Sequence, residues 1–351
     1  MGMSMPAGRG ERPAVRIALG LLISALCLFL AVRGVRLEEV VAVLGQAQPL
    51  PVLAAVGVEF LIFWAIAARW RWLFVPHAAH SPTLAVPVEE GSGAAAPPLG
   101  RLFQFLSIAQ LANAVLPGRT GPLVRVYLAG QGTADGMAFA LTTIVGEKVA
   151  EGLSLLLAAI SILPLVPQVG QLVPKIGISA TLFLAVLASM VVLASDRGRE
   201  AAGRRLERLS VRWPWLLSPA RSALAALDVW RRGRAVLVLA AWTACIWALT
   251  VLLNQLILWS MGIKVPPVAP VVLVVALQIG GRLPSSPGSV GVFHYVSVLA
   301  LSLFDVDKKV ALGYGVILHL VTYLPASLLG LYFLARAGYS LKRLRQVVGP
   351  A

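Results

Sequence analysis

Two stretches of the chain place arginine, proline and glycine together in the middle of an apolar run. The first covers residues 113–125 and the second covers residues 280–294. Proline ends a helix because it lacks an amide donor, and glycine lets backbone approach closely. Broken membrane segments at matching positions in two halves of a chain are typical of a transporter binding site. The sequence therefore predicts such a site at these two breaks.

Four cations accompany the breaks. Arg119 and Arg125 flank the first break, Arg282 opens the second, and Lys148 lies in the apolar run after the first. An ionisable group at membrane depth costs at least ~2.5–3.5 kcal/mol, so each of them needs a partner or a purpose. Guanidinium groups bind phosphate oxygens in a bidentate manner, and amides at broken helix ends add affinity for anions. We expect these cations to bind an anionic headgroup.

Three carboxylates offer another explanation. Glu147 and Glu151 are four residues apart and share one face of a helix, and Glu59 lies within an earlier apolar run. These groups could form structural ion pairs with the cations, or the first two could relay protons in coupled transport. We favour ion pairs over a relay. However, three carboxylates do not cancel four cations, which favours headgroup contact for the cations as a set.

Small residues at the breaks complete the predicted site, either by hydrogen bonding to the headgroup or by letting the backbone approach it. They are Asn113, Gly118, Ser285, Ser286 and Gly288. His294 and His319 can titrate near neutral pH, although a histidine in a helix bundle is more often a hydrogen-bonded structural residue. No metal and no cofactor are expected, because the cysteines and histidines lack metal-ligand spacing.

Composition places the chain in a membrane. Hydrophobic residues make up 58% and charged residues 13% of its 351 residues, whereas a soluble domain usually carries about 25% charged residues. Several apolar runs approach or exceed the roughly 20 residues that a transmembrane helix needs. We predict such helices at residues 15–32, 50–68, 138–163, 176–194, 235–261 and 309–335.

The basic residues orient these helices. Residues 196–234 contain ten arginines, which indicates a cytoplasmic loop, and the basic ends of the chain place both termini in the cytoplasm. Five tryptophans fit an interfacial belt: Trp64, Trp70, Trp72, Trp213 and Trp215. The net charge of +15 is explained by basic loops that meet anionic lipids. We therefore expect membrane lipids, and no nucleic acid, as partners.

The remaining apolar segments are too short to span comfortably. Residues 101–132 and 268–304 form two pairs of such segments, which we interpret as re-entrant hairpins. The expected fold is an all-α polytopic membrane bundle in one domain, residues 1–351. It contains two inverted repeats, 15–163 and 176–335, each with three transmembrane helices and one hairpin. Full crossings remain compatible with the second pair.

The sequence also resembles the lysylphosphatidylglycerol synthase transmembrane-region family over nearly its whole length. The resemblance rests on residues 113–125, on Glu147-Lys148 with Glu151, and above all on residues 284–291. It implies a bacterial inner-membrane protein that moves polar lipids or helps to present them.

Three positions depart from the family pattern. Pro122 and His294 stand where the family often has glutamate, and Lys148 stands where arginine is common. These departures weaken any transfer of specificity for cationic lipids from the synthases. No soluble domain follows Arg345, so we expect no lysyl transfer.

The function predicted from sequence is translocation of a lipid or lipid-linked precursor with an anionic headgroup. The alternative is a non-transporting scaffold for an enzyme of lipid or cell-envelope biosynthesis. A third class, a membrane transferase or phosphatase, lacks a visible nucleophile–base pair or metal site. The chain is therefore not expected to be an enzyme.

Overall fold

A computed structural model describes residues 11–78, 97–116, 120–131, 136–162, 200, 203–204 and 233–337. Ten α-helices and one short 3₁₀ turn make up these ranges, with no strand among them. The predicted helix 176–194 and almost all of the predicted basic loop 196–234 lie outside the described residues.

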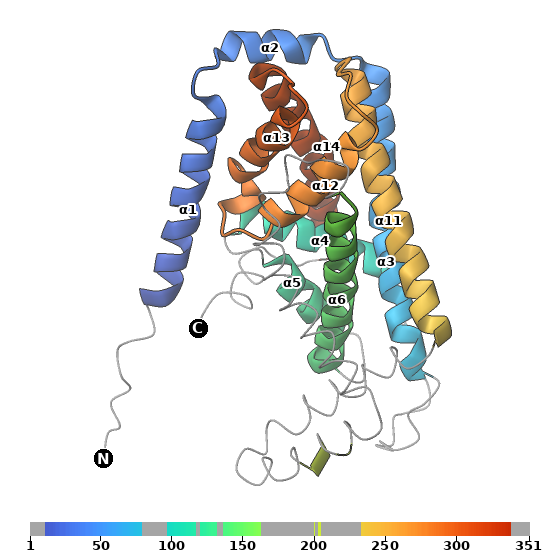
Figure 1. Cartoon of the computed structure of the whole chain (residues 1–351). Helices are drawn as coiled ribbons and strands as arrows, with labels where there is room; N and C mark the ends of the chain where they lie inside the picture. Colours follow the sequence, from blue (N-terminus) through green and yellow to red (C-terminus); the bar gives the residue numbers. More distant parts are fainter. Residues whose placement is uncertain are drawn as a thin grey trace, which may run out of the picture. The chain divides into compact units, whose positions relative to one another are not determined.

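The described helices follow the apolar runs of the sequence (Figure 1). Helices α1, α3, α6, α11 and α14 lie on apolar runs that were predicted as spans, and each of the two short pairs consists of two helices separated by a break. Their bounds are α1 Glu11–Val32, α2 Leu37–Gly45, α3 Pro49–Ala78, α4 Leu99–Val115, α5 Gly121–Gly130, α6 Gly136–Ile162, α11 Gly233–Ser260, α12 Ala269–Gly280, η3 Pro287–Ser289, α13 Val292–Ser302 and α14 Lys308–Arg336.

Three described helices are long and apolar enough to cross a membrane. The qualifying stretches are Pro49–Phe74 of α3, Val236–Ser260 of α11 and Lys308–Arg336 of α14. The bent pair formed by α1 and α2 adds a fourth if the two are counted as one span. The chain therefore has the helices of a multi-pass membrane protein.

The contacts between residues divide the chain into two compact units. The first unit consists of Met1–Phe60, Ser107–Val124 and Thr250–Ala351, and the second of Leu61–Leu106 and Arg125–Leu249. Each unit combines segments that are far apart in sequence. The predicted inverted repeats divide the chain differently, and they stay a prediction.

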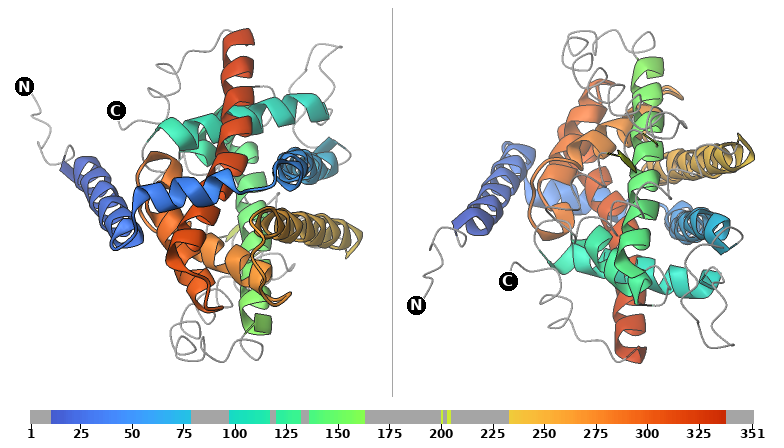
Figure 2. Two further views of the ribbon diagram at one scale, coloured as in Figure 1. Left: turned by 90° about the horizontal axis from the view of Figure 1, so that it is seen from above. Right: turned by 90° about the horizontal axis from the view of Figure 1, so that it is seen from below.

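In the first unit, α1 and α2 meet at a bend of 77°. Gly34 has a φ of 78°, a left-handed conformation that glycine adopts without strain. Carbonyl groups at the end of a helix lack an intrahelical donor. Here Lys308 Nζ supplies one, donating to the carbonyl oxygens of Leu30 at 2.9 Å and Arg33 at 2.6 Å. The bend leaves α2 lying across α14 (Figure 2).

Helix α13 is the centre of this unit and packs against α1, α12 and α14. Glycine makes the approach to α14 close: a Cβ atom added at Gly315 would lie 3.2 Å from Cβ of Ser297. A buried hydrogen bond from the Tyr314 hydroxyl to Asn254 Oδ1, at 2.6 Å, ties α14 to the end of α11. These contacts fix the helix that follows the second break.

One expectation about a helix end needs correction, and one short helix was not predicted. The second span was expected to end at residue 68, but α3 continues to Ala78. The arginine that follows, Arg69, is neutralised by carboxylates and does not force the helix to end. Helix α2 was not predicted, because its nine residues are too few to register as a span.

Candidate functional site

The second break is held against α1 within the first unit. The Ser286 amide donates to Ser24 Oγ at 2.7 Å, and the Ser286 hydroxyl donates to the carbonyl oxygen of Val290 at 3.0 Å. The hydroxyls of Ser285 and Ser289 are hydrogen-bonded at 3.2 Å. The small polar residues predicted to bind a headgroup therefore also shape the break.

The first break is bridged by a side chain. Oδ1 of Asn113, near the end of α4, accepts a hydrogen bond of 2.8 Å from the amide of Gly121, the first residue of α5. The two breaks also approach each other, since a Cβ atom added at Gly288 would lie 3.6 Å from the carbonyl oxygen of Ala114. Gly118 and Arg119 lie outside the described residues.

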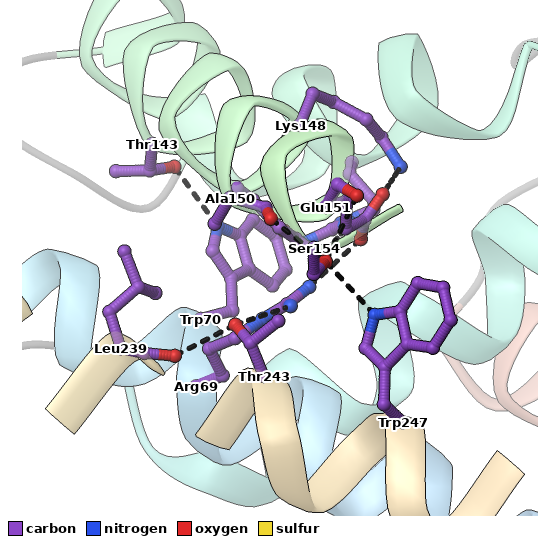
Figure 3. A network of polar contacts seen from close by, with 12 residues as sticks. Arg69, Trp70, Thr143, Lys148, Ala150, Glu151, Ser154, Leu239, Thr243 and Trp247 are labelled. Carbon is purple, nitrogen blue, oxygen red and sulfur yellow. Dashed lines mark hydrogen bonds and ion pairs between the residues drawn. The ribbon is translucent and has the colours of Figure 1, made fainter. Parts of the chain in front are cut away.

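The second unit contains a buried network of ion pairs that joins α3 to α6. Arg69 Nη2 donates to Glu147 Oε1 at 2.7 Å and to Glu151 Oε1 at 2.9 Å. Its Nη1 donates to Oγ1 of Thr243 on α11 at 3.3 Å (Figure 3). The side chains of Arg69 and Glu147 are each only 1% exposed. Because the pair is buried, removing either partner would leave an uncompensated charge and destabilise the fold.

Helix α5 contributes the second guanidinium. Arg125 Nη2 donates to Glu147 Oε2 at 2.6 Å, so Glu147 is shared between two arginines. The Arg125 guanidinium carbon lies 4.1 Å from the centre of the Trp70 ring, at cation–π distance. Trp70 is fully buried, and its indole donates to Oγ1 of Thr143 at 3.0 Å. Its expected place in an interfacial belt is therefore wrong, because it is packed inside the network.

A third cation lies at the edge of this network. Lys148 Nζ donates to Glu151 Oε2 at 2.7 Å, and its side chain is 53% exposed. Among the described residues, the network thus holds three cations, Arg69, Arg125 and Lys148, against the two carboxylates of Glu147 and Glu151. Nε of Arg69 and Nε of Arg125 are buried and have no hydrogen-bond partner among the described residues.

The predicted site residues fall into both units. Arg125, Glu147, Lys148 and Glu151 come together in the second. The first contains Asn113, Arg282, Ser285, Ser286, Gly288, Glu59, His294 and His319.

Two of the residues in the first unit differ sharply in exposure. Arg282 is exposed, and its Nη1 donates to the carbonyl oxygen of Gln278 at 3.4 Å. Glu59 is buried and forms no ion pair with any described residue. Its predicted pairing with an arginine stays a prediction.

Sequence reasoning missed Arg69 as a member of the network, because it directly follows the predicted span 50–68 and was left outside it. The signal was present: Trp70, Trp72 and Leu73 extend the apolar run beyond it. An arginine inside an apolar run needs a partner, by the same reasoning that singled out Arg125.

The family model described as "Lysylphosphatidylglycerol synthase TM region" matches residues 17–330. The matched stretch contains both breaks and every residue of the buried network. It also contains α3, α11 and most of α14, the helices long enough to span a membrane. No curated protein matches the chain.

Proposed function

Since this chain belongs to the lysylphosphatidylglycerol synthase transmembrane-region family, we propose that it is a lipid flippase. The substrate is a lipid or lipid-linked precursor with a phosphate headgroup, which crosses the bacterial inner membrane. Guanidinium and ammonium ions bind phosphate through short charge-assisted hydrogen bonds.

This proposal rests on the excess of cations over carboxylates in the second unit. Three cations face two carboxylates around Glu147, and two guanidinium Nε atoms are buried without a partner among the described residues. Structural ion pairing alone would be complete with two cations. The third, Lys148, is half exposed, and a headgroup phosphate would supply the missing negative charge. Arg119, Arg125 and Arg282 remain the other proposed headgroup ligands.

The proposed architecture places the breaks where a headgroup passes. The pairs α4–α5 and α12–α13 are proposed to be re-entrant hairpins of two inverted repeats, entering the membrane from opposite faces. Support comes from the short apolar helices on both sides of each break and from the approach of Gly288 to Ala114. Non-helical backbone at membrane depth is tolerated only inside protein or beside a wet cavity.

Cysteine labelling tests the proposed topology. With Cys27 and Cys245 replaced, single cysteines at Ser92 and Ser222 should react with an impermeant maleimide only from the cytoplasmic side. A cysteine at Gln168 should react only from the opposite side, because positively charged loops stay in the cytoplasm. Labelling at Ser222 from outside would overturn the orientation.

Reconstitution of the purified protein in liposomes tests the function itself. Fluorescent phospholipids in the inner leaflet should become accessible to an external quencher faster than in protein-free vesicles. A scaffold would leave the leaflets unmixed and would instead co-purify in fixed proportion with an enzyme. That result would replace the proposed function with the alternative.

Replacing Lys148 with glutamine should slow lipid movement about tenfold, the loss of roughly 1.5 kcal/mol of charge-assisted binding. The fold should survive, because Glu151 keeps its 2.9 Å bond to Arg69. Lys309→Gln is the matched control, since Lys309 is a partly exposed lysine that pairs with Glu39 at 3.8 Å in the first unit. Equal rates in the two variants would remove Lys148 from the site.

Arg119 gives a second test at the first break. Arg119→Ala should slow transport while the protein stays folded. Arg119→Lys should recover only part of the rate, because an ammonium group keeps the charge but lacks the bidentate fork.

A further inference from the structure

Two histidines of the first unit lie side by side next to the second break. The rings of His294 on α13 and His319 on α14 are stacked, with centroids 5.1 Å apart and planes at 28°. Tyr323 covers the His319 ring at 4.4 Å and 5°. Phe293 meets His319 edge-on at 5.2 Å. The four rings form an aromatic cluster between α13 and α14.

Both imidazoles have an unused nitrogen. Nδ1 of His294 and Nδ1 of His319 are buried and have no hydrogen-bond partner among the described residues. His294 as a whole is only 9% exposed. Buried polar atoms are nearly always hydrogen-bonded. Two neighbouring rings that each have a buried nitrogen without a partner therefore need an explanation. A neutral imidazole carries one acceptor nitrogen, which can take up a proton.

The charged surroundings of the pair are sparse. Helix α12 has no ionisable side chain. Among the described side chains of α1, the only ionisable one is that of Cys27. On α2, Glu39 pairs with Lys309, and Glu38 makes no ion pair with a described residue. Tyr295 lies on α13. The remaining ionisable side chains of α14 are Lys308, Tyr314, Tyr323, Tyr332 and Arg336.

None of the described carboxylates contacts either imidazole. Two imidazolium ions at 5.1 Å without a counter-charge repel each other strongly. Starting from two neutral imidazoles, the pair can therefore take up one additional proton but not two.

The cluster favours His319 as the holder of that proton. A cation stacked on an aromatic face is stabilised by the ring quadrupole, and Tyr323 presents its face to His319. His294 is the third residue of α13, at the positive end of the helix dipole, where a cation is disfavoured. Imidazolium at His319 would therefore lie between a stabilising ring and a neutral neighbour.

We propose that the His294–His319 pair binds a single proton and couples this proton to movement of the second break. His294 follows Gly291, the last residue of the break, by three positions, and His319 belongs to a long span. A charge gained or lost between α13 and α14 changes the contact that anchors the break. The proton is thus the second ligand of the flippase proposed above, and this inference rests on that function.

Nitrogen-15 spectra of the reconstituted protein test proton binding without any transport. The chain has four histidines, so His77→Gln/His80→Gln leaves only the pair visible. Between ~pH 8 and ~pH 4, one imidazole should become imidazolium while the other stays neutral. Tyr323→Leu should shift this step to lower pH. Unchanged spectra over that range, or two independent protonations, would overturn the proton site.

Lipid movement then tests coupling. A pH gradient across the vesicle membrane should change the initial rate about fivefold or more in the chain and in His77→Gln/His80→Gln. His294→Gln and His319→Gln, verified as folded by gel filtration, should lose this response. An intact response in both variants would refute coupling. If lipid moves in none of the proteins, the proposed function fails, and the spectra alone decide whether the pair binds a proton.

Discussion

Glu147→Gln should be among the most destabilising single substitutions in the second unit, at about 3–5 kcal/mol. Glu147 accepts hydrogen bonds from Arg69 at 2.7 Å and from Arg125 at 2.6 Å, and its side chain is 1% exposed. Glutamine fits the same space but removes the negative charge. Two buried guanidinium groups would then share only the partly exposed carboxylate of Glu151.

Thermal unfolding in detergent, followed by the loss of monodisperse protein, measures the effect. Lys148→Gln is the control for stability, because it breaks a partly exposed pair in the same network and should cost less than about 1 kcal/mol. Equal melting temperatures for the two variants would show that the buried pairs do not hold α3, α5 and α6 together.

Gly291→Ala should also be strongly destabilising, for two separable reasons. Gly291 has a φ of 92°, a conformation that costs a residue with a side chain about 1–3 kcal/mol. An alanine Cβ would also collide with the carbonyl oxygen of Ser24 on α1. Overpacking of this kind adds about 1–3 kcal/mol. We expect α1 to be displaced from the second break.

Gly34→Ala separates the two contributions. Gly34 also has a positive φ, 78°, but nothing lies within 4 Å of the position of its Cβ atom. It should therefore show the conformational cost without the collision. Limited proteolysis of α1 should increase in Gly291→Ala and not in Gly34→Ala. The same increase in both would mean that the contact with Ser24 does not hold α1 in place.

Much of the fold could be predicted because helix length and polarity are local properties of the sequence. Helix α14 begins at Lys308 and ends at Arg336, each within one residue of the prediction from its apolar run. The breaks were equally visible, since proline and glycine act on their own backbone. The continuation of α3 past Arg69 could not be predicted, because the carboxylates that neutralise Arg69 lie far along the chain, at Glu147 and Glu151.

The candidate site shows the same limit. Its ionisable residues could be singled out, because a charge in an apolar run stands out without any knowledge of its neighbours. Pairing could not be predicted, since Arg69 meets Glu147 only through packing of α3 on α6. The stacking of His294 on His319 likewise depends on how α13 meets α14. Each histidine alone was more simply explained as a structural residue.

The distance in sequence between Arg69 and Glu147 also bears on how the protein is made. Arg69 lies within the candidate span Pro49–Phe74, and its partner is synthesised 78 residues later. At about 5–20 residues per second, the ribosome takes about 4–16 s to cover that distance. During this interval a lone arginine on α3 favours a shallow position in the lipid. We therefore expect helix α3 to reach its final depth only after α6 has been inserted, and the ion network to form late in membrane assembly.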